Sequence, residues 1–381
     1  MRPSSLLLSA LMLLPATAAA QDLVSLPEQS DIVSWPTRGW TEGETMDIDD
    51  IIGADFNTPS DITGQTRGLV VVRGGRIVFE RYADGFDADT RHVSWSMAKS
   101  VTHALVGRAV ELGLIPDIDA PMPGAFSGDD PRGRISWRHW LQMLDGLDYA
   151  EIGVEGLDND VIQMMYGPGR FDVIDFARDE FTAEHTPGTH WNYSTAGYHI
   201  ISRALQSLIP DICIDASADP RTCRANPRVT SDWLDREFFA PLGLDAVEEY
   251  DHAGTLLGGS LIYMSARDFA KFGLLYLRDG VWEGERFLPE GWVDFARSNP
   301  QGSDSNLYGA GFWLSPEKPD NPDTLMPPPY DAFHAGGHEG QTIWIVPSRD
   351  MVIVRVGLMP NGPESWNGLF AMNQSIASAL D

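Results

Sequence analysis

The sequence predicts an α+β fold, in which an antiparallel sheet is flanked by helices and joined to a mostly helical lobe. Two patterns of paired strands, one near each end of the 381-residue chain, supply the sheet. Between them, the segment 111–254 contains many Pro, Gly and Asp breaks and few strand-like runs. Strands at both ends with helices between them indicate one sheet that is assembled from two distant parts of the chain.

The first twenty residues have the pattern of a secretory signal peptide. A basic Arg2 precedes an apolar run over 6–14, and three alanines at 18–20 close the segment. We expect cleavage before Gln21, which places the mature protein in a bacterial periplasm or outside the cell. The apolar run is shorter than the roughly 18 residues that a membrane span needs, and no later segment reaches that length.

The first hairpin follows a Trp- and Asp-rich N-terminal arm over 21–65. Two apolar runs, 68–72 and 76–80, flank the turn sequence Arg73-Gly74-Gly75. Short β-branched runs on either side of a glycine turn predict a β-hairpin.

The second hairpin lies near the C-terminus, where 342–346 and 351–356 flank a Pro-Ser-Arg-Asp turn. A final helix is predicted over 366–380. The predicted organisation is therefore a signal peptide (1–20), an N-terminal arm (21–65), a sheet domain (66–110 with 255–381) and a helical lobe (111–254).

Between the first hairpin and the lobe, residues 95–112 predict a helix that carries a serine and a lysine on one face. Apolar residues recur at helical spacing from Met97 to Leu105, and Gly113 is a natural stop. Ser96 and Lys99 are three positions apart, so both project from the first turn. Free backbone N–H groups and the positive end of the helix dipole lie there, which favours an anion near Ser96.

Lysine is scarce in this chain, since only three of its 27 basic residues are lysines. A buried lysine can lose its proton and act as a base, whereas arginine stays charged. Ser-x-x-Lys is therefore typical of a serine nucleophile with a lysine base. The pattern occurs at Ser96–Lys99 and again at Ser315–Lys318, but the second lies in a Pro-rich polar loop where lysine stays hydrated. The remaining lysine, Lys271, is expected on a solvated helix face.

The local sequence is also compatible with a simpler interpretation of the first pair, in which Ser96 caps the helix and Lys99 lies at the surface.

A serine–lysine pair needs a proton shuttle for the leaving group, and a tyrosine with a depressed pKa suits that task. Tyr193 is the candidate because a Pro187-Gly188 turn delivers it just before an amphipathic helix. Its alternative role is that of a core tyrosine beneath a loop.

The two cysteines and the net charge limit other function classes. Cys213 and Cys223 are ten positions apart, and in an oxidising compartment we expect them to form a disulfide worth about 3 kcal/mol. The formal net charge is −28, which disfavours nucleic acid and anionic membranes as partners. Two cysteines with no histidine nearby do not indicate a zinc site.

Over about 65–375 the chain resembles the serine β-lactamase-like superfamily, specifically its class C-like and esterase branch. The stretches that carry the resemblance are Ser96-Met97-Ala98-Lys99-Ser100, Ile135 to Leu147, Tyr193-Ser194-Thr195, Gly258-Gly259-Ser260 and Tyr308 to Trp313. The resemblance implies a β-lactamase/transpeptidase-like fold and no cofactor. It also implies Ser96 as nucleophile, with Lys99 as base and Tyr193 as the third catalytic residue, although either Lys99 or Tyr193 could take the Ser96 proton. The implied oxyanion site is formed by the backbone N–H groups of Ser96 and His338.

Two positions depart from the family pattern. Thr195 stands where Asn or Ser is usual. The stretch from Phe333 to Gln341, which includes His334, corresponds to the Lys-Thr-Gly motif of β-lactamases but has no lysine. This form of the third motif resembles 6-aminohexanoate-dimer hydrolase and related esterases. Because the missing lysine ordinarily helps to bind a β-lactam carboxylate, penicillin-type substrates are disfavoured. Thr195 and His334 are expected to contact substrate.

These observations predict a serine hydrolase that cleaves a small ester or amide, with an undetermined oligomeric state. Activity as a β-lactamase or D-amino-acid peptidase, or a non-catalytic penicillin-binding-like role, remains the alternative. A metallohydrolase using His185 with His190, or His334 with His338, is a further rival, but neither pair forms a His-Glu-x-x-His pattern. No Gly-x-Ser-x-Gly elbow occurs either, which disfavours an α/β-hydrolase triad.

Overall fold

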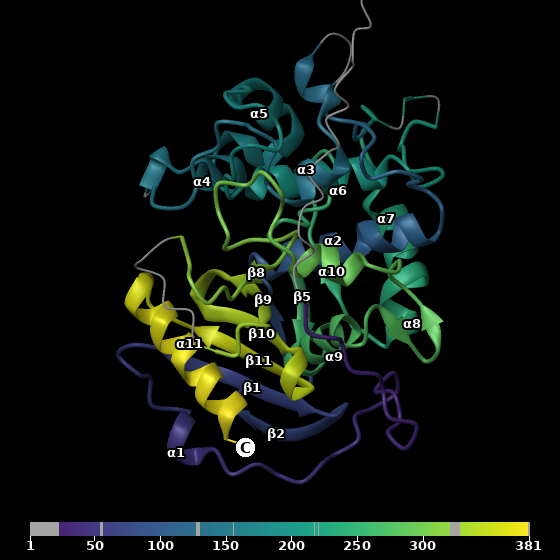
Figure 1. Cartoon of the computed structure of the whole chain (residues 1–381). Helices are drawn as coiled ribbons and strands as arrows, with labels where there is room; N and C mark the ends of the chain where they lie inside the picture. Colours follow the sequence, from purple (N-terminus) through teal and green to yellow (C-terminus); the bar gives the residue numbers. More distant parts are fainter. Residues whose placement is uncertain are drawn as a thin grey trace, which may run out of the picture.

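A six-stranded antiparallel sheet forms the centre of the protein, with strand order β2-β1-β11-β10-β9-β8 (Figure 1). The structure is a computed structural model that describes residues 23–53, 56–126, 130–154, 156–216, 218–219, 221–320 and 328–379. The predicted signal peptide lies outside these described residues. The α+β class expected from the sequence is confirmed.

Both predicted hairpins are present, and they pair with each other. Strands β1 (Gln65–Arg73) and β2 (Arg76–Tyr82) form the first, and β10 (Gln341–Val346) and β11 (Met351–Leu358) form the second. Pairing of β1 with β11 joins the N-terminal and C-terminal parts of the chain in one sheet. The sheet is completed by β9 (Phe333–Gly337) and β8 (Trp313–Leu314).

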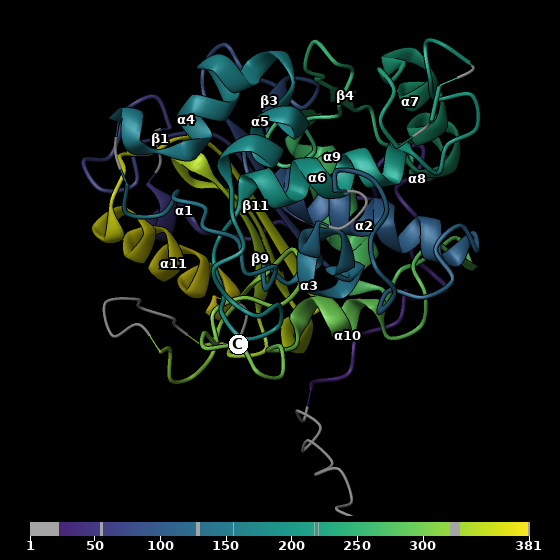
Figure 2. The ribbon, with the colours of Figure 1, turned by 90° about the horizontal axis from the view of Figure 1, so that it is seen from above.

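The sheet is covered on both faces, so its central strands are continuously apolar rather than alternating. In β1, Leu69 and Val71 join the apolar cluster on the side of helix α11 (Pro363–Ser378). Their neighbours Val70 and Val72 join the cluster on the opposite side, where α9 (Ala266–Leu277) packs against β1, β10 and β11. Figures 1 and 2 show α11 and α9 on opposite sides of the sheet.

The lobe over 111–254 is mostly helical, as expected, and it shares a hydrophobic core with the sheet. Helix α2 (Met97–Glu111) lies at the junction, because it contacts both β9 and the lobe helix α6 (Thr195–Gln206). The other α-helices are α1 (Asp49–Ile52), α3 (Trp137–Leu141), α4 (Asp160–Met165), α5 (Val173–Glu180), α7 (Pro227–Leu234), α8 (Ala240–Leu242) and α10 (Trp292–Arg297).

Short elements complete the chain. A second sheet contains β3 (Arg91–Val93), β5 (Ile262–Ser265) and β4 (Val247–Glu248), and a small hairpin contains β6 (Val281–Trp282) and β7 (Glu285–Arg286). Single turns of 3-10 helix occur at Pro131–Arg134, Gly156–Asp158, Pro168–Phe171, His338–Gly340 and Pro347–Arg349, and a π-helical turn at Asp235–Phe239. None of the described helices is both long and apolar enough to cross a membrane.

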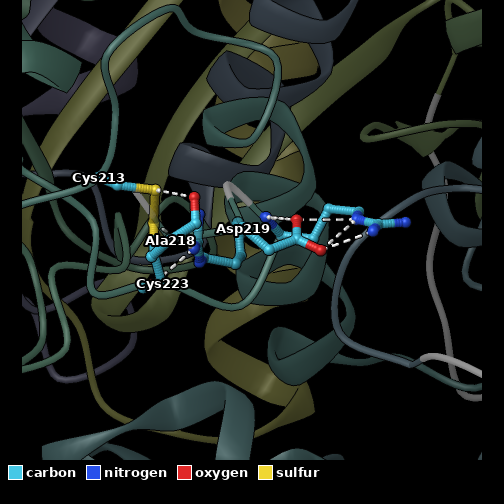
Figure 3. Close-up of a disulfide and its surroundings, with 6 residues drawn as sticks. Cys213, Ala218, Asp219 and Cys223 are labelled. Carbon is cyan, nitrogen blue, oxygen red and sulfur yellow. Dashed lines mark hydrogen bonds and ion pairs between the residues drawn. A yellow bond between two sulfur atoms is a disulfide. The ribbon is translucent and has the colours of Figure 1, made fainter. Parts of the chain in front are cut away.

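A disulfide joins Cys213 and Cys223 in the loop between α6 and α7 (Figure 3). The two Cα atoms are 5.6 Å apart, and the Cys223 N–H also donates to the Asp219 carbonyl at 2.9 Å. This loop therefore has a covalent closure that supplements its backbone hydrogen bonds.

One prediction about a lysine is wrong. Lys271 on α9 was expected on a solvated face, but its ammonium group donates to the Gly243 carbonyl and to Asp268 Oδ1. The turn that ends α8 folds over this part of α9, so a side chain that looks peripheral in the sequence is held in place. Lys318, by contrast, is exposed as expected.

Candidate active site

Ser96 lies at the N-terminus of α2, at the end of a strained turn from β3. The preceding residue, Trp95, has a φ of 45°, a left-handed conformation that costs a non-glycine residue about 1–3 kcal/mol. Ser96 makes no side-chain capping hydrogen bond to the helix. Its hydroxyl oxygen instead accepts a hydrogen bond from Lys99 at 2.9 Å. The capping interpretation of Ser96 is therefore wrong.

Lys99 is fully enclosed, with 1% of its surface exposed, so the surface-lysine interpretation is also wrong. Besides Ser96, its amino group donates to Thr195 Oγ1 and to the Gly259 carbonyl, both at 2.8 Å. Burial lowers the pKa of Lys99 to about 8, while the negative charge of Glu151 acts in the opposite direction. An amine with this pKa is partly neutral in mildly alkaline solution, which a general base requires.

Tyr193 packs beside this pair, with the centre of its ring 4.8 Å from the Lys99 nitrogen. The ring stacks on Trp313 at 5.3 Å between centroids, and the residue is buried. Burial, together with the negative charge of Glu151, raises the pKa of Tyr193 well above its usual value, and a hydrogen bond with Ser96 opposes this only in part. The depressed pKa expected for a shuttle is absent, and Tyr193 is a neutral phenol.

Glu151 is a site residue that sequence reasoning missed. Its two carboxylate oxygens accept hydrogen bonds from the Thr195 backbone N–H and the Thr195 hydroxyl, both at 2.9 Å. Thr195 in turn accepts from Lys99, so a continuous chain of hydrogen bonds links Glu151 to Ser96. Glu151 lies in an irregular loop of the lobe, where no periodicity marks it, and only the folded chain brings it to Thr195.

The Gly258-Gly259 segment passes so close to α2 and α6 that it has no room for side chains. A Cβ atom on Gly258 would lie 2.4 Å from Thr102 Oγ1 and 2.3 Å from Ser202 Oγ. The segment is held further by the Gly259 N–H, which donates to His199 Nδ1 at 3.2 Å. These glycines therefore allow the Gly259 carbonyl to reach Lys99.

Strand β9 runs along the other side of Ser96. A Cβ atom on Gly337 would lie 2.3 Å from the Ser94 carbonyl oxygen and 3.3 Å from the Ser96 nitrogen, so this glycine permits the strand to approach Ser96. His338, expected to supply an oxyanion N–H, is the next residue and begins the turn after β9. Its side chain is exposed and meets the Trp95 ring edge-on at 5.6 Å. The oxyanion assignment stays a prediction.

His334 lies on β9, in the stretch expected to correspond to the third motif. The side chain is buried, and burial lowers its pKa to about 3, so it is neutral at physiological pH. Its ring lies parallel to Trp313 at 6.5 Å, within a group of aromatic rings around Tyr193. The other members of this group are Trp191 and Tyr308. The wall of the site near Tyr193 is therefore aromatic and uncharged.

Of the two histidine pairs named for a rival metal site, His185 and His190 lie together, with ring centroids 4.1 Å apart. His190 Nδ1 is 2.6 Å from Asp304, whose other oxygen accepts the Trp191 N–H. This arrangement fixes the backbone that leads to Tyr193. Among the residues that the structure describes, no three His, Cys, Asp or Glu side chains gather as metal ligands would.

The β-lactamase family model matches residues 56–208, the segment that contains Ser96, Lys99, Tyr193 and Thr195. The family resemblance expected from the motifs is thereby confirmed.

Two known proteins and a further solved structure are similar to the chain over most of its length. It is 25% identical over 341 residues to a 6-aminohexanoate-dimer hydrolase from Paenarthrobacter ureafaciens, covering 80% of this chain and 76% of that protein. A Bacillus anthracis structure assigned as a 6-aminohexanoate-dimer hydrolase is similar over 94% of this chain and 91% of its own, with 19% identity and a TM-score of 0.67. A β-lactamase from Mycobacterium bovis matches 82% of this chain and 95% of its own, with 17% identity and a TM-score of 0.55. The β-lactamase/transpeptidase-like fold is confirmed.

Proposed function

We propose that the protein is a serine hydrolase that cleaves an ester or amide bond through an acyl-enzyme on Ser96. The observation that carries the proposal is the contact of 2.9 Å between the Ser96 hydroxyl and the amino group of Lys99, a buried lysine. Ser96 attacks the carbonyl carbon and passes its proton to Lys99. The oxyanion that forms accepts hydrogen bonds from the backbone N–H groups of Ser96 and His338, and each such donor is typically worth about 2.7–4 kcal/mol of barrier.

The pKa directions favour Lys99 over Tyr193 as the base in this cycle. Lys99 has a lowered pKa and its nitrogen contacts Ser96, whereas the pKa of Tyr193 is raised. Tyr193 then serves as a neutral relay: its O–H protonates the leaving group while the proton held by Lys99 replaces it. In the second half of the cycle, water attacks the acyl carbonyl carbon and gives one proton to the neutral Lys99. The bond to Ser96 Oγ then breaks, and the same pair passes that proton to Ser96.

The lining of the site near Tyr193 disfavours a substrate that places a carboxylate there. Neutral His334 replaces a cation, and the aromatic rings beside Tyr193 offer apolar contact but no partner for a carboxylate. A linear amide is a suitable substrate class, because the 25%-identical relative is named for hydrolysis of such a dimer. We further propose that residues 1–20 direct export and that the mature enzyme acts in the periplasm or outside the cell.

The test is a hydrolysis panel on wild-type protein and Ser96→Ala, with short p-nitrophenyl esters, nitrocefin, D-amino-acid peptides and linear amide dimers as substrates. We expect esters or linear amides to be cleaved, and Ser96→Ala to lose several orders of magnitude in kcat. Ser315→Ala, which changes the second Ser-x-x-Lys pattern, is the matched control and should retain activity. Hydrolysis by Ser96→Ala at a near wild-type rate would exclude the mechanism.

The base is tested by Lys99→Arg, which keeps a cation but cannot lose its proton. We expect kcat/KM to fall by about 10²–10⁴-fold, the usual contribution of general acid–base catalysis. Lys318→Arg is the control and should leave the rate unchanged.

Other outcomes would support the alternative functions. If nitrocefin or D-amino-acid peptides were the preferred substrates, the protein would be a β-lactamase or a D-amino-acid peptidase instead of an esterase or amidase. Failure of Ser96 to react with a serine-directed phosphonate would support a non-catalytic role, and loss of activity with chelator would support a metallohydrolase.

A further inference from the structure

Lys99 can act as a base toward Ser96 only if its lone pair, rather than one of its protons, faces the Ser96 hydroxyl. Three oxygens surround its nitrogen: Ser96 Oγ at 2.9 Å, and Thr195 Oγ1 and the Gly259 carbonyl at 2.8 Å each. Neutral lysine has two N–H groups and one lone pair. The lone pair reaches Ser96 only when the other two oxygens both accept hydrogen bonds from Lys99.

These two oxygens differ in how firmly their role is fixed. The Gly259 carbonyl can only accept a hydrogen bond, whereas a threonine hydroxyl can either accept or donate. If the Thr195 hydroxyl donated to Lys99, it would occupy the lone pair that must take the Ser96 proton. Another group must therefore accept a hydrogen bond from the Thr195 hydroxyl, so that its single hydrogen does not point at Lys99.

Glu151 is that acceptor. One of its oxygens accepts the Thr195 hydroxyl at 2.9 Å, and the other accepts the Thr195 backbone N–H at the same distance. Because the two contacts come from one residue at the first turn of α6, the carboxylate is aligned on Thr195. A second anchor comes from the Glu151 carbonyl, which accepts a hydrogen bond from Asn159 at 2.9 Å.

We propose that Glu151 is a positioning residue that, through the Thr195 hydroxyl, directs the lone pair of neutral Lys99 at Ser96. This inference rests on the proposed function, and it adds a residue whose carboxylate acts on Ser96 only through Thr195 and Lys99. It also gives Thr195 a role in orienting the base in place of the expected contact with substrate.

The charge of Glu151 has a second effect, which makes the proposal measurable. The negative charge of Glu151 raises the pKa of Lys99, whereas burial lowers this pKa by a larger amount. Removing the charge should therefore lower the pKa of Lys99 further. The other titratable groups facing Lys99 or Glu151 are Tyr193, His199, Asp160, Tyr149 and Tyr308. Burial keeps His199 and the three tyrosines neutral over the range of the assay.

The central experiment is Glu151→Gln, assayed with p-nitrophenyl acetate from pH 6 to 10. The amide NH₂ can donate to Thr195 Oγ1, which frees the threonine hydroxyl to donate to Lys99. We expect kcat/KM at the plateau to fall about 10–100-fold, as for other outer partners of active-site groups. We also expect the acid limb of the profile to move to lower pH. A purely structural defect would reduce the amount of folded enzyme without moving that limb.

A double-mutant cycle tests whether Glu151 acts through Thr195. Thr195→Val removes the hydroxyl, so adding Glu151→Gln to it should cost little more than either change alone. Thr195→Ser retains the hydroxyl and should restore most of the activity lost in Thr195→Val. Asp145→Asn is the matched control, because Asp145 is a buried lobe carboxylate that accepts from the Leu147 N–H and makes no contact with Lys99.

The outcomes separate this inference from the proposed function. An unmoved acid limb in Glu151→Gln, or fully additive losses in the double variant, would overturn the role of Glu151 while leaving Ser96 as nucleophile. Activity that survives Ser96→Ala would overturn the proposed function itself. If Glu151→Gln does not fold, as judged by circular dichroism, then equal rates for Thr195→Val and Thr195→Ser would refute the hydroxyl relay.

Discussion

At the scale of single residues, a buried lysine whose amino group contacts a serine hydroxyl dominates the chemistry. Burial costs Lys99 part of its proton affinity, and this cost is what makes it useful as a base. The three lysines of the chain have three different environments: Lys99 is enclosed beside Ser96, Lys271 is paired on α9, and Lys318 is exposed. The same side chain type therefore occurs as a proposed base, a buried anchor and a solvated charge.

The pKa of Lys99 sets the expected pH dependence of the enzyme. Below about pH 8 the amine is protonated and cannot accept the Ser96 proton, so kcat/KM should fall tenfold for each pH unit. Above that value the rate should level off, because the raised pKa of Tyr193 keeps its phenol protonated. Stopped-flow hydrolysis of p-nitrophenyl acetate under kcat/KM conditions would measure the limb. A flat profile between pH 6 and pH 9 would contradict Lys99 as the base.

The residues that could be predicted from the sequence are those whose relation is local. Ser96 and Lys99 share one helical turn, and Tyr193 follows a turn and precedes a helix. Glu151 could not be found in this way, since it meets Thr195 across 44 positions and belongs to a loop without periodicity. The pKa of Tyr193 is raised, whereas the sequence predicts a lowered pKa, because the sequence does not show how deeply this side chain is buried.

At the scale of elements, the site depends on how closely strand β9 approaches the N-terminus of α2. The two hairpins were predictable because each has a clear turn between apolar runs. Strand β9 has a weak pattern of its own, with glycines at positions 336 and 337, and it forms because β10 pairs with it. Strands β3 and β5 are too short for a period to be visible, although they flank the turn to Ser96.

Adding one methyl group to β9 should separate these elements. In Gly337→Ala, the new Cβ would lie 2.3 Å from the Ser94 carbonyl oxygen, which is backbone and cannot rotate away. We expect a loss of about 1–3 kcal/mol in stability from overpacking, with a marked fall in kcat. Thermal unfolding and ester hydrolysis would measure the two effects.

Gly336→Ala is the comparison for this change, because its Cβ would lie 3.2 Å from the Trp313 ring, a side chain that can shift. Its effects should be smaller. Equal kcat values for wild type and Gly337→Ala would show that the close approach of β9 to Ser96 is not needed for catalysis.

At the scale of the whole molecule, the net charge of −28 should lower the free energy of unfolding. Like charges on a compact surface repel one another, and salt screens them over a Debye length of about 10 Å at 0.1 M. We therefore expect the Tm to rise by a few degrees between about 0.01 M and 0.3 M NaCl, measured by calorimetry. Hydrolysis of a neutral ester at 25 °C is the control and should change little. A Tm that falls with added salt would contradict the prediction.

The pairing of β1 with β11 has a consequence for how this protein is made. Strand β1 begins at residue 65, but its partner is not complete until residue 358, so the central sheet cannot close until almost the whole chain has been synthesised. Contacts of such long sequence separation form slowly, because the ends of a long loop must first meet. Because the sheet forms late, the chain should remain unfolded during most of its synthesis. An unfolded chain can pass through a membrane pore before it folds, which export directed by the predicted signal peptide would require.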